Sequence, residues 1–147
     1  MRNKGFTLIE LLVVISIIAL LSSVALSSLN AARAKGRYAT IIRQMKEIQT
    51  ASHGYYTDTG SHAADTGPGG APAFVPAYLR SWPTPPCGAG WTYDWDNWTS
   101  SNGFVGVHLH NTTLGAQYKL CTDTTSACSA SSVQDILTVA QRSITCQ

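Results

Sequence analysis

Residues 4–10 read Lys4-Gly5-Phe6-Thr7-Leu8-Ile9-Glu10, and they open an apolar stretch that continues to about Leu29. A carboxylate therefore lies inside a segment that otherwise reads as soluble in lipid. An acidic residue in a membrane span costs roughly 2.5–3.5 kcal/mol on insertion scales, so its presence indicates a function. Arg2 and Lys4 precede the stretch, and basic flanking residues favour the cytoplasmic side. The sequence thus predicts an N-in, C-out membrane segment with a functional acid at Glu10.

The basic leader, the glycine, the phenylalanine and the glutamate together resemble the class III signal of type IV pilins and of the related pseudopilins of type II secretion. This resemblance implies cleavage by a prepilin peptidase after Gly5, N-methylation of the new terminal Phe6, and a role for Phe6 and Glu10 in filament assembly. It also implies a homo-oligomeric helical filament, with an assembly ATPase and a platform protein as separate partners. The precursor is then expected in the cytoplasmic membrane and the product in a filament at the cell surface.

Elementary electrostatics gives a reason for this combination of residues. Cleavage after Gly5 creates an α-amino cation on Phe6, and Glu10 lies about one helical turn further on. A neighbouring subunit displaced along a filament can bring its own Phe6 amine to this acid. Two unit charges about 4 Å apart attract by roughly 4 kcal/mol at an effective dielectric constant of 20, which is comparable to the cost of the acid in the membrane. We therefore expect pairing between subunits.

Four other classes of protein share part of this pattern. A secretory signal peptide also starts with basic residues, and Ala32-Arg33-Ala34 resembles its cut site, but its apolar core runs only about 7–15 residues. A plain single-span anchor needs about 20 apolar residues and gives Glu10 no role. A type II secretion pseudopilin has the same N-terminal features and forms a short periplasmic polymer. A single-span protein that displays its head to glycans or nucleic acid stays monomeric and keeps its leader.

The chain divides into a leader (1–5), an apolar half-helix (6–29), an amphipathic half-helix (30–56) and a head (57–147). No proline occurs before Pro68, so one rod of roughly 75 Å is expected, with Gly54 as its C-cap. Apolar residues recur at three- and four-residue steps along its second half, which predicts a stripe buried against the head: Tyr38, Ile41, Ile42, Met45, Ile48 and Tyr55.

Three runs in the head have strand character: 91–95, 104–110 and 116–121. The first alternates cleanly, so both of its tryptophans and its tyrosine share one face. Residues 132–142 fit a helix, and residues 136–140 fit an edge strand equally well. The fold class predicted is therefore α+β and type IV pilin-like, with one long N-terminal helix packed on a small antiparallel sheet.

Four cysteines follow the apolar segment: Cys87, Cys121, Cys128 and Cys146. An even number in a small exported domain indicates two disulfides. Of the three possible connectivities, the resemblance to the C-terminal loop closure of pilins favours Cys121–Cys146 with Cys87–Cys128. Each bridge contributes about 2–4 kcal/mol.

Other polar clusters give weaker signals. Asp94 and Asp96 share a strand face, as do His108 and His110, but too few ligands accompany either pair for calcium or zinc, so we expect solvated strand faces and no metal or other cofactor. Five aromatic residues are expected to lie in the core, with Trp98 the most exposed of them: Trp82, Trp91, Tyr93, Trp95 and Trp98. The basic run from Arg33 to Lys46 belongs to the stem, so we do not expect nucleic acid as a partner. The chain shows no nucleotide-binding loop or nucleophile triad, and we expect no enzymatic activity.

Overall fold

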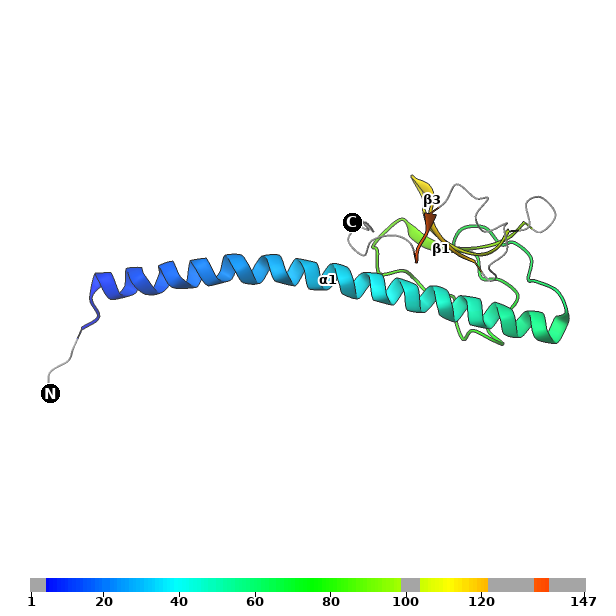
Figure 1. Cartoon of the computed structure of the whole chain (residues 1–147), viewed down its shortest axis with the longest axis horizontal. Coiled ribbons are helices and arrows are strands. Elements are labelled where there is room, and N and C mark those ends of the chain that lie inside the picture. The colour runs from blue at the N-terminus through cyan, green and yellow to red at the C-terminus, as the bar shows by residue number, and fades with distance from the viewer. Residues whose placement is uncertain (1–4, 99–103, 122–133, 138–147) are drawn as a thin grey trace.

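One long helix, α1 (Leu8–Thr59), dominates the computed structural model, which describes residues 5–98, 104–121 and 134–137. Its 52 residues correspond to a rod of about 78 Å. Figure 1 shows the N-terminal half projecting freely, while the head lies along one side of the C-terminal half. The predicted single rod is confirmed. Its backbone hydrogen bonds are satisfied within the helix, as a lipid-exposed segment requires.

The helix ends at Gly60, six residues beyond the expected C-cap. Gly60 is left-handed (φ 72°, ψ 6°), and its N–H donates to the carbonyl of Tyr56 at 2.8 Å. The predicted cap at Gly54 is wrong, because Gly54 lies inside the helix beneath the ring of Tyr78. A Cβ on Gly54 would stand 3.1 Å from Tyr78 Cδ1, so this glycine allows close approach of a loop.

The head contains a four-stranded sheet in the order β1 (Trp91–Trp98), β2 (Phe104–Asn111), β3 (Gly115–Cys121) and β4 (Gln134–Asp135). The first three strands form the predicted antiparallel meander, with Trp95 opposite Val107 and Val107 opposite Leu120. The fourth strand is short and runs parallel to β3. It lies within residues 132–142, for which the sequence fitted either a helix or an edge strand. Residues 132–133 and 138–142 lie outside the described part of the chain.

The core lies between α1 and one face of the sheet. Ile41, Met45 and Ile48 are fully buried, whereas Tyr38, Ile42 and Tyr55 are partly buried around them. The facing side chains of the sheet include Tyr93, Trp95, Val107 and Leu109, all inaccessible to solvent. The predicted stripe and the predicted aromatic core are therefore both confirmed.

Polar contacts fix the register of the helix on the head. Tyr93 donates its hydroxyl hydrogen to Gln44 Oε1 at 2.8 Å, and Gln44 Nε2 donates to the carbonyl of Thr84 at 3.2 Å. Tyr38 donates to the carbonyl of Ile136 at 3.1 Å, which connects the stem to the turn after β4. These bonds join the helix to three separate parts of the head.

The long loop between α1 and β1 runs along the outer edge of β1. Gly69 N–H donates to the carbonyl of Tyr93 at 2.9 Å, and Thr66 N–H to that of Trp95 at 3.4 Å. The side chains of Trp95 and Asn97 both donate to the carbonyl of Ala63, at 3.2 and 2.9 Å. The loop is therefore attached to β1 through both backbone and side chains.

Replacing Ile41 by alanine is expected to destabilise the head by roughly 2–5 kcal/mol, since it leaves a cavity in the core between α1 and the sheet. The measurement is urea unfolding of the full chain in detergent, followed by tryptophan fluorescence. The matched control is Ile18→Ala, which makes the same change in the exposed half of α1. An equal loss in both variants would contradict the assignment of the core.

Candidate functional site

The N-terminus of α1 is closed by a capping box between Thr7 and Glu10. Thr7 is the N-cap with an extended backbone, and its hydroxyl oxygen accepts from the N–H of Glu10 at 3.3 Å. In return, Glu10 Oε2 accepts from Thr7 N–H at 2.9 Å and from the Thr7 hydroxyl at 2.6 Å. Both contacts of the carboxylate use one oxygen, and Oε1 makes no hydrogen bond among the described residues.

This capping role of Glu10, and with it the role of Thr7, was missed in the sequence analysis. The signal was present, because threonine followed three residues later by glutamate before an apolar run is the pattern of a capping box. Glu10 therefore has a role within its own chain as well as the expected one between subunits. A test of pairing between subunits therefore needs a variant that keeps the capping role of Glu10.

Gly5 and Phe6 lie outside the helix, and the peptide bond between them is exposed. The Phe6 side chain is 83% exposed. A Cβ built on Gly5 meets no atom within 4 Å. The fold of this chain consequently sets no requirement for glycine at position 5.

Among the residues that the structure describes, none covers the apolar half of α1. An 18-residue window in the helix is long and apolar enough to cross a membrane, and none of it is buried. Glu10 is the sole charged residue between Phe6 and Leu29. Phe6, Glu10 and neighbouring apolar residues line a shallow groove of about 370 Å³; the others are Ile9, Val13 and Val14.

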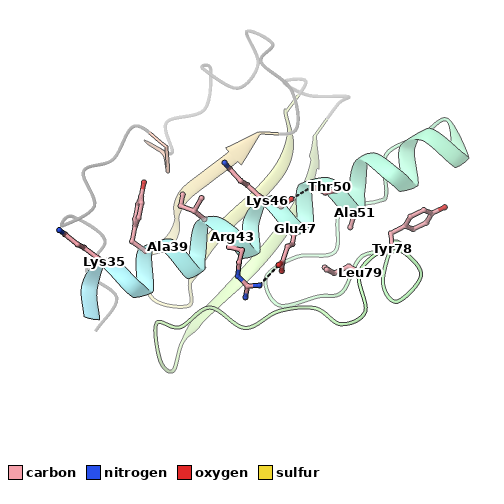
Figure 2. A pocket seen from close by; sticks show the side chains of 11 residues that line it. Lys35, Ala39, Arg43, Lys46, Glu47, Thr50, Ala51, Tyr78 and Leu79 are labelled. Carbon is pink, nitrogen blue, oxygen red and sulfur yellow. Dashed lines mark hydrogen bonds and ion pairs between the residues drawn. The ribbon is translucent and has the colours of Figure 1, made fainter. Parts of the chain in front are cut away.

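A larger groove runs beside the second half of α1. Its volume is about 1130 Å³, and its floor is formed by apolar residues of α1 together with Tyr78 and Leu79 from the loop. Figure 2 shows Lys35, Arg43 and Lys46 along the helix at its margin, with Arg43 paired to Glu47 at 2.9 Å. The basic residues of the stem are thus exposed on the helix.

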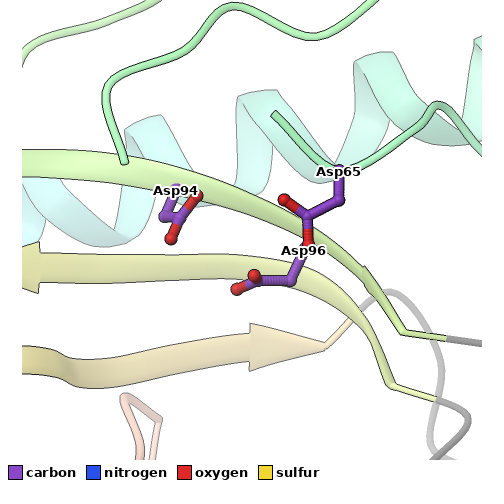
Figure 3. Close-up of side chains that lie close together, drawn as sticks. All are labelled: Asp65, Asp94 and Asp96. Carbon is purple, nitrogen blue, oxygen red and sulfur yellow. The ribbon is translucent and has the colours of Figure 1, made fainter. Parts of the chain in front are cut away.

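The sheet face turned away from α1 carries three carboxylates that lie close together. Figure 3 shows Asp94 and Asp96 on β1 and Asp65 extending from the loop toward them. One oxygen from each carboxylate lies within 4.8 Å of one oxygen of each of the other two. Two ionised carboxylates at that separation repel each other by about 3 kcal/mol at an effective dielectric constant of 20. Burial, and then the charges of Asp96 and Asp65, raise the pKa of Asp94 to about 6.

The expectation of solvated polar faces on these strands was wrong for three of the four residues. Asp94, Asp96 and His108 are buried, and His110 is half-buried. His108 Nδ1 contacts Asp96 Oδ2, and its ring stacks on Phe104 with centroids 4.8 Å apart. The alternating pattern along the strands assigned these four residues to one face correctly. It could not indicate that side chains on this face are buried. Trp98 is 40% exposed, as predicted.

Cys87 is buried and disulfide-bonded. The side chains of Cys121, Cys128 and Cys146 lie outside the described part of the chain. The expected pairing Cys87–Cys128 with Cys121–Cys146 therefore stays a prediction.

The fold and the N-terminal site define a class of protein: a subunit with an apolar helical stem, an acid near the start of that stem, and a small α+β head. Residues 1–26 match the family described as "Prokaryotic N-terminal methylation motif". A curated relative, "Type IV wide pilus major component PilA4" of Thermus thermophilus, is 39% identical over 66 residues.

That match covers 44% of this chain and half the length of the relative. No solved structure matches the chain. The start of this chain is therefore similar to a prokaryotic N-terminal methylation motif, and a stretch of 66 residues is similar to a type IV pilus component.

Replacing Thr7 by alanine is expected to loosen the first turn of α1, because the two hydrogen bonds of the Thr7 hydroxyl with Glu10 are lost. The expected cost is about 1 kcal/mol, equivalent to roughly fivefold faster amide hydrogen exchange at Leu11 and Leu12 in micelles. Thr7→Ser keeps the hydroxyl and should exchange like the parent chain. Identical exchange in the alanine and serine variants would show that the capping box is not formed in solution.

Proposed function

We propose that this chain is a structural subunit of a type IV pilus-like surface filament, assembled from a membrane-held precursor after cleavage following Gly5. The observation that carries the proposal is the exposed apolar half of α1, in which Glu10 is the sole charge. Such a surface needs lipid in the precursor and other copies of the same helix in the product.

The transfer from lipid to filament has a simple physical basis. Lateral packing of identical apolar helices replaces the acyl chains, so little apolar surface meets water at either stage. The shallow groove beside Phe6 and Glu10 offers one place for a neighbouring helix. Removal of the leader also removes Arg2 and Lys4, which hold the precursor N-terminus at the cytoplasmic side.

The geometry of Glu10 supports an additional role between subunits. Its Oε2 caps the helix through Thr7, while Oε1 makes no bond among the described residues. One carboxylate can therefore cap its own helix and accept from the Phe6 amine of a neighbour. Cleavage creates that amine, which couples processing to assembly.

Charge distribution favours a second contact between copies. Three exposed cations of the stem, Lys35, Arg43 and Lys46, line the large groove beside Tyr78 and Leu79, and the head carries an excess of acidic residues. A neighbouring head can dock against this stem surface in the filament. High salt is expected to weaken this contact more than the packing of the apolar helices.

A type II secretion pseudopilin is the second candidate, since the N-terminal methylation motif at residues 1–26 does not distinguish it from a pilin. The two differ in the product: long surface fibres for a pilin and a short periplasmic polymer for a pseudopilin. Electron microscopy of cells that express the chain with its assembly machinery separates them.

Replacing Glu10 by glutamine is expected to abolish or strongly reduce filaments while leaving membrane insertion and leader cleavage intact. Glutamine at this position still serves a capping box, so the change removes the charge and retains the cap. The measurement is the amount of sheared surface filament relative to processed subunit in the membrane.

Thr7→Ala is the matched control, because it removes the hydroxyl bonds of the cap and retains the charge. If pairing with the Phe6 amine is the role of Glu10, Thr7→Ala should assemble far better than Glu10→Gln. Normal filaments from Glu10→Gln would refute the pairing.

Replacing Gly5 by leucine is expected to leave unprocessed precursor in the membrane. The chain itself tolerates the new side chain, because no atom lies within 4 Å of its Cβ position. Mass spectrometry reports whether the leader is retained, and circular dichroism in detergent verifies that the fold is unchanged. Complete cleavage of the variant would show that the peptidase makes no use of the small residue.

A further inference from the structure

Three aspartates from two separate parts of the head converge on the sheet face away from α1. Asp94 and Asp96 alternate along β1, and Asp65 reaches the same place from the loop (Figure 3). The loop is attached to β1 by the backbone bonds of Thr66 and Gly69, so the approach of Asp65 is part of the fold. The cluster unites residues about thirty positions apart in the sequence.

Two of the three carboxylates are held in place by other groups. Asp65 accepts from Gly67 N–H at 3.0 Å and from Trp98 Nε1–H at 2.8 Å. Asp96 contacts His108 Nδ1, which is itself buried. A carboxylate has about four acceptor positions, so these contacts orient the oxygens and leave lone pairs for a further ligand.

The third carboxylate has no such support. Asp94 is only 7% exposed, and its Oδ1 is buried without a hydrogen-bond partner among the described residues. A buried acid without a partner is costly, and each such group in a folded protein calls for an explanation. His108 lies directly opposite Asp94 on β2, but its Nδ1 contacts Asp96, and Lys119 lies opposite His108 on β3, two strands away from Asp94. A positive charge among the three carboxylates would supply the missing partner.

We propose that Asp65, Asp94 and Asp96 bind a hard divalent cation, Ca²⁺. Calcium takes six to eight oxygen ligands, typically from carboxylates, backbone carbonyls and water, and three carboxylates supply the charged part of such a set. Zinc is a poorer match, because the His108 nitrogen on this side already contacts Asp96. The site revises the expectation of no metal, which was based on Asp94 and Asp96 without Asp65.

The cation has a structural consequence for the head. It would link the α1–β1 loop to the middle of β1, beside the two backbone bonds that already join them. An affinity on the order of 10⁻⁴–10⁻³ M is typical of calcium sites in extracellular modules. Binding at that level depends on the calcium outside the cell.

The test uses the full chain in detergent after treatment with EDTA, with Tb³⁺ as a luminescent substitute for Ca²⁺. The Trp98 indole donates to Asp65, so excitation of tryptophan is expected to sensitise Tb³⁺ emission. Emission should saturate at one Tb³⁺ per chain, and CaCl₂ should displace it. Asp94→Asn and Asp65→Asn should each weaken binding by at least about tenfold.

The matched control is Asp58→Asn, which neutralises an exposed aspartate bonded to Tyr78 outside the cluster and should bind like the parent chain. Far-ultraviolet circular dichroism verifies that each variant is folded. Because Asp65 is exposed, its replacement leaves the core intact, so weaker binding by this variant cannot be attributed to unfolding. The proposal is overturned if the parent chain shows no saturable, calcium-displaceable emission. It is equally overturned if folded Asp65→Asn binds as tightly as Asp58→Asn.

Discussion

The exposed apolar half of α1 is the constraint on which the rest of this structure depends. Burying a large apolar side chain contributes about 1.5–3 kcal/mol, and more than a dozen such side chains on this half are exposed in the isolated chain. The surface is therefore stable only in lipid or against other apolar helices. Everything beyond about residue 30 has to remain soluble while attached to it.

The helix meets this demand by changing character along its length without a break. Its first half is apolar on all sides, whereas its second half buries a stripe centred on Ile41, Met45 and Ile48. The described part of the head packs on that stripe, with Tyr38, Gln44 and Tyr93 fixing its position. One element thus combines a segment long and apolar enough to cross a membrane with a scaffold for the head, and the capping box gives the acid near its start a partner within the chain.

Local pattern predicted most of this architecture. The spacing of Ile41, Met45 and Ile48 identified the buried stripe, and the alternation of Trp91, Tyr93 and Trp95 identified a strand with an aromatic face. What escaped prediction came from contacts distant in sequence. Gly54 resembled a helix cap because nothing local reveals that Tyr78 packs on it, and Asp94 resembled a solvated residue because nothing local reveals that Asp65 approaches it. The parallel pairing of β4 with β3 also escaped prediction, because it joins segments that are distant in sequence.

The attachment of the α1–β1 loop to β1 affects how copies of this chain interact when they are crowded together. Strand β1 is an edge strand of the sheet. An unprotected edge strand presents free N–H and C=O groups that can pair with strands from other molecules. Thr66 and Gly69 occupy acceptors on Trp95 and Tyr93 that an incoming strand would otherwise use. Edge-to-edge pairing through this strand is thereby disfavoured between crowded copies of the chain.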